Sequence, residues 1–236
     1  MIRRKTIAFE NEPQSLNWRG DLLVDWVGGG SLYSLDGEYE RGGRIYSYRF
    51  DAAIQSDNGV YTVIYEKLGT KGVILKNGEM LRELNRSFYH ATAYEYPITF
   101  LKLPNGEYAL IHCPNEYCQI EVELADTGEK ITTLEGRKPE DCFHSRFRVN
   151  QSNSVLLNAG WVWHPYGILQ LYDIAKGIDD TSVFDKTNTD FPTNAEVCSA
   201  EFLTDDLLVV SATAEEPLDE EELNDPISLH PGQIGL

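Results

Sequence analysis

Thr127-Gly128-Glu129 forms a turn signal after a short apolar stretch, and comparable signals occur at Asp36-Gly37-Glu38, Asn77-Gly78-Glu79 and Ala175-Lys176-Gly177. The glycines of these four segments lie 41, 50 and 49 residues apart. A period of roughly 40–50 residues built from short strands is typical of propeller-like arrays, in which each repeat forms one small sheet. The recurrence therefore predicts an all-β fold made of repeated antiparallel sheets.

Short runs of β-branched, aromatic and other apolar residues recur in phase with the turns and indicate buried central strands. These runs span residues 22–24, 61–64, 108–111, 155–157 and 207–210. Strands that lead into the turns are expected at residues 32–35, 73–76, 120–124 and 168–174. Outer strands are expected at 44–48, 80–84 and 131–134, and strands before the central ones at 50–54, 98–101 and 147–149. Four strands joined by hairpins predict one propeller blade per repeat, and a helix is expected only around residues 219–223.

The repeats predict a single domain that spans residues 1–236. They cover approximately residues 14–48, 49–88, 94–135, 144–185 and 196–236. The last repeat lacks an outer strand, whereas residues 1–10 contain a spare strand with alternating side chains. We therefore predict a five-bladed β-propeller in which Thr6 to Phe9 pair with the strand around Ile234, so that no sheet edge stays open. A shortened six- or seven-bladed propeller and an irregular β-sandwich remain alternatives.

The charge of the chain narrows the classes of partner. Its 236 residues include 38 acidic and 20 basic side chains, which give a formal net charge of −18. A field of this sign repels phosphate backbones and anionic membrane surfaces, so neither nucleic acid nor membrane is expected as a partner. The sequence shows no apolar segment long enough for a signal peptide or a membrane span, and its four cysteines are too few for a disulfide scaffold. We expect a cytoplasmic protein.

Several segments resemble the repeat of the WD40-like β-propeller family. Residues 104–110, 120–122 and 127–136 follow the course of that repeat, and Leu171-Tyr172-Asp173-Ile174 stands where the family has its Trp-Asp pair. In the third repeat Glu123-Leu124 occupies that place, and the Gly-His pair of the family does not occur. The resemblance implies the propeller fold and says little about function.

Aromatic residues are densest at Trp161-Val162-Trp163-His164-Pro165-Tyr166. Alternation along a strand places Trp161 and Trp163 on one face, and such rings bury a large area at low entropic cost when they bind a partner. Trp26 occupies the corresponding place in the first repeat. We therefore predict a binding rim of Trp26, Trp161, Trp163, His164 and Tyr166. The alternative is that one tryptophan plugs the gap between blades and the other packs locally.

Other groups of residues give weaker signals for a metal, catalytic or phosphate-binding site. Cys113, Cys118, Cys142 and His144 do not have the spacing of common zinc fingers, and no metal or cofactor is expected. Asp25, Asp51 and Glu95 are candidates for carboxylates that meet at a propeller axis. The acidic run at residues 215–223 is expected to be a solvated loop. Gly28-Gly29-Gly30 is expected to be a bend between strands, because no lysine or helix follows it.

These observations favour a non-enzymatic scaffold that binds a protein or peptide through an aromatic rim on a propeller. No catalytic residue is assigned. The alternative function is a carbohydrate or small-molecule hydrolase that uses carboxylates at the propeller axis. The oligomeric state is left open.

Overall fold

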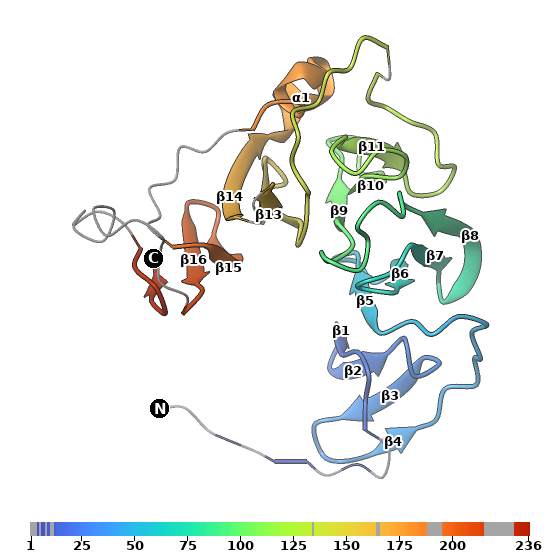
Figure 1. Ribbon diagram of the computed structural model, residues 1–236. Coiled ribbons are helices and arrows are strands. Elements are labelled where there is room, and N and C mark those ends of the chain that lie inside the picture. Colours follow the sequence, from blue (N-terminus) through green and yellow to red (C-terminus); the bar gives the residue numbers. More distant parts are fainter. Residues whose placement is uncertain are drawn as a thin grey trace. The chain divides into compact units, whose positions relative to one another are not determined.

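The structure is a computed structural model that describes residues 4, 6–7, 9, 12–133, 135–163, 166–187, 195–214 and 229–236. The chain divides into two compact units, Met1–Asn85 and Arg86–Leu236. In the described residues, 17 strands form five antiparallel sheets of three or four strands each (Figure 1). Helix is limited there to one α-helix and one turn of 3₁₀ helix. The predicted all-β class is therefore confirmed, and so is the prediction of successive small sheets.

The first unit holds two four-stranded sheets whose strands follow one another in chain order. The strands of the first sheet are β1 (Asn17–Arg19), β2 (Leu22–Asp25), β3 (Ser31–Ser34) and β4 (Tyr39–Glu40). Those of the second sheet are β5 (Ala52–Gln55), β6 (Tyr61–Tyr65), β7 (Lys71–Lys76) and β8 (Glu79–Asn85). The core of this unit consists of the buried side chains of Val24, Trp26, Phe50, Ile64, Val73 and Leu75.

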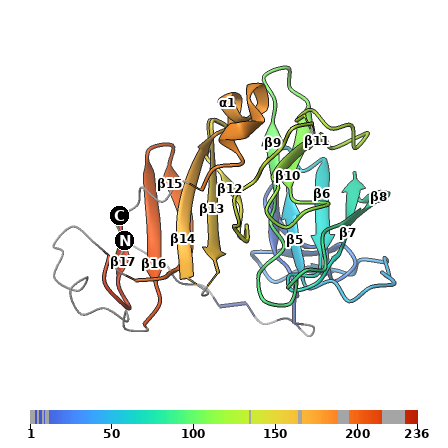
Figure 2. The same cartoon turned by 45° about the horizontal axis from the view of Figure 1, so that its top comes forward.

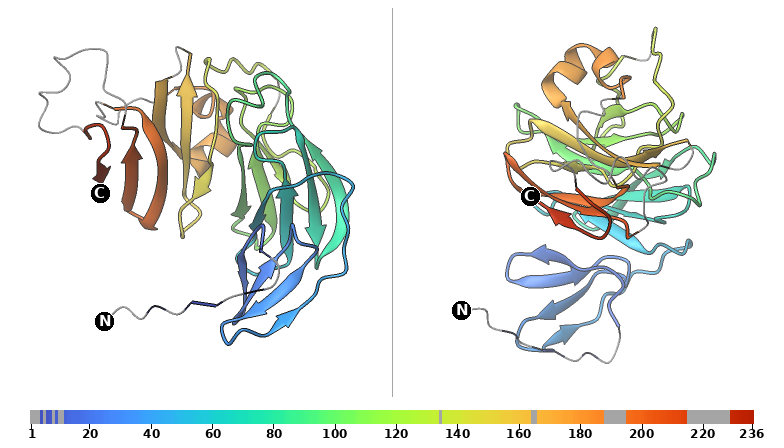
Figure 3. Two further views of the ribbon diagram at one scale, coloured as in Figure 1. Left: turned by 60° about the horizontal axis from the view of Figure 1, so that its bottom comes forward. Right: turned by 60° about the vertical axis from the view of Figure 1, so that its left-hand side comes forward.

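The second unit holds three sheets of three strands each. The first sheet contains β9 (Ile98–Lys102), β10 (Tyr108–His112) and β11 (Glu121–Leu124), and the second contains β12 (Arg148–Val149), β13 (Val155–Val162) and β14 (Tyr166–Asp173). The third contains β15 (Val197–Thr204), β16 (Leu207–Ala212) and β17 (Ile234–Gly235), which lie side by side in Figure 2. Figure 3 shows β15 and β16, in orange, from two further sides.

The predicted central strands are internal strands in all five sheets, namely β2, β6, β10, β13 and β16. Every residue of β6 and β10 is buried, because their apolar runs have neighbouring strands on both sides and packed side chains on both faces. β16 differs, since it is mostly half-buried and Leu207 is exposed. The sequence pattern thus predicts the place of these strands in their sheets better than their burial.

Glycine and asparagine shape the hairpin between β7 and β8. Asn77 and Gly78 form its two-residue turn and have φ angles of 52° and 78°. Positive φ at both central residues defines the type I′ turn, whose twist matches that of the flanking strands. Gly37 and Gly128 also have positive φ, at 95° and 74°. Three of the four predicted turns therefore rest on a backbone conformation that favours glycine.

The fourth predicted turn is wrong. Residues Ile174–Asp179 form the helix α1, and Thr181–Val183 follow as a 3₁₀ helix. Asp173 caps α1, because its side chain accepts a hydrogen bond of 3.0 Å from the Lys176 N–H. A Cβ atom on Gly177 would lie 2.3 Å from Cζ of Phe184. This glycine is therefore explained by a close ring contact within a helix and not by a hairpin.

The predicted outer strands also need correction. In the first sheet the outer strand is β4, at residues 39–40, and residues 44–48 form no strand. After β11, within the described residues, only a single bridge between Glu123 and Lys130 replaces the strand expected at 131–134. A very short edge strand such as β4 exposes little backbone to pairing with other chains.

The described residues of the N-terminal segment form no strand. The ring of Phe9 instead contacts Tyr33 of β3 edge-on, with 4.4 Å between the ring centroids. Pairing of Thr6 to Phe9 with the strand around Ile234 stays a prediction, as do the single domain and the number of blades. The helix expected around 219–223 lies outside the described residues. Among the helices of the described part, none has the length and apolar character that a membrane span requires.

Candidate functional site

Seven aromatic side chains of the second unit form a continuous set of ring contacts, which we name the aromatic cluster. Its members are Tyr89, His90, Tyr94, Tyr117, Phe143, Trp161 and Trp163. They come from the segments before β9, between β10 and β11, and between β11 and β12, and from β13 with the turn that follows it. The cluster therefore joins residues that are far apart in the sequence.

Phe143 lies at the centre of the aromatic cluster and is 1% exposed. Its ring is stacked on Trp161 with 4.0 Å between centroids, and on Tyr117 with 4.5 Å. The backbones of Phe143 and Trp161 also exchange two hydrogen bonds of 2.8 and 3.0 Å. Gly160 permits this approach, since a Cβ atom there would lie 2.4 Å from the carbonyl oxygen of Phe143. The stack is thus fixed by both backbone and side chains.

The outer part of the aromatic cluster reaches solvent. Trp163 is 55% exposed and Tyr89 is 47% exposed. The exposed His90 ring lies between them, at 4.5 Å from Tyr89 and 5.7 Å from Trp163. Phe88, next to Tyr89 in the sequence, is 87% exposed. Exposed aromatic rings on a packed base are typical of interaction surfaces.

Arg86 fixes the segment that carries Tyr89 and His90. This side chain is buried, and its guanidinium lies 4.5 Å from the ring centre of Tyr94 and 4.9 Å from that of Tyr96. It also donates hydrogen bonds of 2.7 and 3.0 Å to the carbonyl oxygens of Ala91 and Tyr94. Burial lowers the pKa of Arg86 from its usual value and raises the pKa of Tyr94 to about 12. The segment is therefore held from inside before any partner binds.

Carboxylates lie beside the rings. The Tyr117 hydroxyl donates a hydrogen bond of 2.7 Å to the exposed Asp141. Desolvation and this hydrogen bond raise the pKa of Tyr117, so the hydroxyl keeps its proton. Desolvation, then Asp141 and Glu116, raise the pKa of the nearby Cys118 thiol. The carboxylates Asp141 and Glu116 therefore give the part of the aromatic cluster around Tyr117 a negative charge.

Only some of the rim residues predicted from the sequence meet in this cluster. Trp161 and Trp163 do, and their rings lie 6.1 Å apart, as alternation along a strand predicts. Tyr166 is half-buried and pairs with Val162 across the β13–β14 hairpin. His164 lies outside the described residues.

Trp26 lies in the first unit and is buried in its core, with 4% exposure. Its Nε1 donates a hydrogen bond of 2.8 Å to Gln55 Oε1. Gly30 and Gly78 lie against the same ring. The structure therefore places Trp26 in the core of the first unit and not in the aromatic cluster, contrary to the prediction that it belongs to the binding rim.

Sequence reasoning missed five members of the aromatic cluster, namely Tyr89, His90, Tyr94, Tyr117 and Phe143. One signal was present, because Phe88-Tyr89-His90 follows a strand and is as rich in aromatic rings as residues 161–166. Tyr117 and Phe143 are isolated in the sequence, so only the contacts of the folded chain assign them to the cluster.

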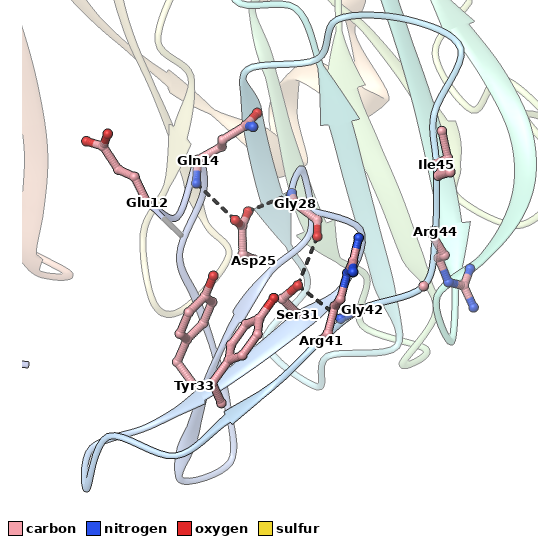
Figure 4. A pocket seen from close by; sticks show the side chains of 12 residues that line it. Glu12, Gln14, Asp25, Gly28, Ser31, Tyr33, Arg41, Gly42, Arg44 and Ile45 are labelled. Carbon is pink, nitrogen blue, oxygen red and sulfur yellow. Dashed lines mark hydrogen bonds between the residues drawn. The ribbon is translucent and has the colours of Figure 1, made fainter. Parts of the chain in front are cut away.

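Asp25 is a structural carboxylate in the first unit. It is 2% exposed and accepts hydrogen bonds from the backbone N–H groups of Gln14, Ser15 and Gly28, and from the Ser15 hydroxyl, all between 2.9 and 3.0 Å. It lines a hollow of about 700 Å³, and Figure 4 shows it there with Tyr33 and Arg41 among the lining side chains. Four donors satisfy this carboxylate, so it is explained without a substrate.

The other carboxylates named for a hydrolase have partners of their own. Asp51, also in the first unit, accepts a hydrogen bond of 2.7 Å from the Lys67 N–H. Glu95, in the second unit, lies 4.0 Å from Arg146. Neither residue forms part of the aromatic cluster.

Cys142 and His144, which flank Phe143 in the sequence, belong to a buried polar network. Cys142 Sγ donates to Gln170 Oε1 at 3.3 Å, and Asn158 Nδ2 donates to the same oxygen at 2.6 Å. Burial raises the pKa of Cys142 to about 12 and lowers that of His144 to about 4. In the part of the chain that the structure describes, no set of three His, Cys, Asp or Glu side chains is arranged to hold a metal ion.

Comparisons with known proteins show the fold alone. No protein-family model matches the chain, and no curated protein matches it. Among solved structures, the chain is similar to the β-propeller domain of Cps50 (Swd1) from Myceliophteria thermophila, with 13% identity and a TM-score of 0.55 over 89% of this chain and 64% of that one. KlHsv2 with its loop 6CD replaced by a Gly-Ser linker matches 67% of this chain and 57% of that one, with 14% identity and a TM-score of 0.36. The chain thus spans less than two thirds of the length of either structure. The resemblance to WD40-like propellers that the sequence predicted is confirmed at the level of the fold.

Proposed function

We propose that the protein is a non-enzymatic scaffold that binds a protein or peptide through the aromatic cluster. One observation carries this proposal: Trp163 and Tyr89 are about half exposed, yet both belong to a ring stack built on the buried Phe143. The exposed tryptophan ring leaves apolar surface in water, although a packed aromatic base lies next to it. Binding of a partner would cover this surface, and exposed Trp and Tyr residues are the commonest hot spots of interfaces.

Rigidity of the base supports the proposal. The two backbone hydrogen bonds between Phe143 and Trp161 and the buried guanidinium of Arg86 fix the segments that carry the exposed rings. Side chains that are already ordered lose less entropy on binding, so more of the contact energy appears as affinity. The likeness to a propeller domain is in keeping with a scaffold role and does not identify a partner.

The scaffold that we propose is a five-bladed propeller of residues 1–236, closed by residues 1–10. Within the described residues the last sheet has three strands, as do the other two sheets of the second unit, and a strand from residues 1–10 would give it a fourth.

The experiment is a peptide-display selection against the full chain, followed by affinity measurement with Trp163→Ala. Loss of a hot spot costs about 2 kcal/mol, so we expect affinity for the selected peptides to fall about 30-fold. Trp18→Ala is the matched control, because Trp18 is 59% exposed and lies in the first unit, outside the aromatic cluster. Equal affinities of the Trp163→Ala and wild-type proteins for all selected peptides would refute the proposed site.

A further inference from the structure

Two rings of the aromatic cluster are about half exposed to solvent, Trp163 at 55% and Tyr89 at 47%. A guanidinium or ammonium group that lies within about 6 Å of the centre of a Trp or Tyr ring gains about 0.5–2 kcal/mol, depending on how far it is desolvated. The neighbouring segment already contains this interaction, since Arg86 lies 4.5 Å from the ring centre of Tyr94 and 4.9 Å from that of Tyr96. Trp163 and Tyr89 offer the same kind of ring without an internal cation on it in the described contacts.

The charges beside the rings have the sign that attracts a cation. Asp141 is exposed and is held in place by the Tyr117 hydroxyl, while Glu116 is exposed next to Tyr117 in the sequence. Arg146 of the same unit is already engaged, because its guanidinium donates to the Ala159 carbonyl oxygen at 3.1 Å and lies 4.0 Å from Glu95. The net charge of −18 adds a long-range field of the same sign.

Other ligands use only part of this surface. A proline-rich peptide would stack on the rings and gain little from Asp141 and Glu116, and a sugar would offer these carboxylates only neutral hydroxyl donors. An acidic peptide would be repelled by them. A basic segment uses both the ring faces and the carboxylates.

We propose that the partner of the aromatic cluster is a basic peptide segment, with an Arg or Lys side chain on the exposed rings of Trp163 and Tyr89 and a second basic side chain beside Asp141. This inference rests on the proposed function, because it names the chemistry of the partner for the same surface. It is narrower than that function, since a binding scaffold does not need a basic partner.

The first test uses four labelled peptides with the sequences (Gly-Ser-Arg)₃, (Gly-Ser-Lys)₃, (Gly-Ser-Gln)₃ and (Gly-Ser-Glu)₃. Fluorescence anisotropy with the full chain should show at least tenfold tighter binding of the Arg and Lys peptides than of the Gln peptide, and no binding of the Glu peptide. Asp141→Asn should weaken binding of the Arg peptide a few-fold and reduce its dependence on salt. Equal binding of the Arg and Gln peptides would overturn the inference.

A second comparison separates ring contact from general attraction to an acidic protein. Trp163→Phe keeps an aromatic face, whereas Trp163→Leu keeps an apolar side chain without one. We expect binding of the Arg peptide to be largely retained in the first variant and to fall about tenfold in the second, with Trp18→Ala unchanged. Thermal unfolding of each variant shows that the fold is intact. Equal losses in the Phe, Leu and Trp18→Ala variants would mean that the peptide binds by net charge alone, which overturns the inference.

The peptide-display selection distinguishes the two proposals. Selected peptides that depend on Trp163 but are not enriched in Arg and Lys would leave the binding function standing and refute the basic partner. Selected peptides of which none depends on Trp163 would refute both.

Discussion

Phe143 and Trp161 are joined twice, once through their rings and once through their backbones. Their rings are inclined by only 4° at 4.0 Å between centroids, and each backbone N–H donates to the carbonyl oxygen of the other residue. The backbone pairing sets the register of the segment before β12 against β13, and the register in turn places the rings face to face. The aromatic cluster is therefore a product of strand pairing and not only of hydrophobic contact.

Gly160→Ala should disturb this relationship directly. The added Cβ atom would lie 2.4 Å from the Phe143 carbonyl oxygen, and this contact is with backbone, which cannot rotate away. We expect a loss of about 1–3 kcal/mol in the free energy of unfolding, measured by urea titration. Gly43→Ala is the control, because nothing lies within 4 Å of a Cβ atom there and its φ is not positive. If Gly160→Ala is as stable as Gly43→Ala, the close approach of the two backbones is refuted.

Arg86→Lys should loosen the segment that carries Tyr89 and His90. Lysine keeps the charge but cannot donate from a planar fork to the Ala91 and Tyr94 carbonyl oxygens while stacking on two tyrosine rings. A lost hydrogen bond from a buried charged donor costs about 1.5–3 kcal/mol. Hydrogen exchange should become faster at the amide of Ala93, which donates to the His90 carbonyl oxygen. Protection equal to that of the wild-type protein would show that Arg86 does not hold this segment.

His144 makes stability depend on pH. Burial lowers its pKa to about 4 in the folded chain, against about 6.5 when it is unfolded. The unfolded state therefore binds more protons between these values, and stability is lost as the pH falls from about 6.5 toward 4, by up to about 3 kcal/mol.

Urea unfolding at pH 7 and pH 5 measures this contribution. His144→Gln is expected to be less stable at pH 7, because it loses the contact of His144 Nε2 with the Cys118 carbonyl oxygen at 3.1 Å. It should also lose less stability than the wild-type protein between the two pH values. The same pH dependence in both proteins would rule out His144 as its source.

Removal of residues 1–10 tests the proposed closure. If Thr6 to Phe9 complete the last sheet, the truncated chain should melt at a temperature several degrees lower and should aggregate more readily, because a sheet edge is opened. Phe9→Ala in the full chain is the control for the separate loss of the ring contact with Tyr33. If the truncated chain has the same melting temperature and aggregates no more than Phe9→Ala, residues 1–10 stabilise the protein only through the contact of Phe9 with Tyr33.

Local patterns predicted the central strands well, because each of these strands needs only its own residues to indicate it, whereas the outer strands at 44–48 and 131–134 were wrong. Asn77-Gly78 predicted a hairpin, and both residues have the positive φ that such a turn requires. Gly177 misled the same reasoning, since a glycine selected by a neighbouring ring looks identical in the sequence to one selected by a turn. Only the position of Phe184 in the folded chain distinguishes the two.

For the candidate site too, local sequence patterns could not reveal the contacts that form only in the folded chain. Trp161 and Trp163 could be predicted to share a face, because alternation is a property of one strand. Tyr89 and Tyr117, which lie 4.9 Å apart, are separated by 27 residues, and no local pattern relates them. Trp26 shows the converse, because an equivalent place in a repeat does not make a ring exposed when a neighbouring side chain such as Gln55 encloses it.

Asp25 holds the chain in front of β1 through three donors, of which two are the peptide N–H groups of Gln14 and Ser15 and the third is the Ser15 hydroxyl. A peptide N–H is the same for almost every residue type, so the identity of residue 14 is free to change while its position stays fixed. The carboxylate has no such freedom, and neither has Gly28, where a Cβ atom would lie 2.2 Å from Asp25 Oδ2. Over evolutionary time this part of the protein should therefore keep the aspartate, the glycine and the hydroxyl of residue 15, and let residue 14 change.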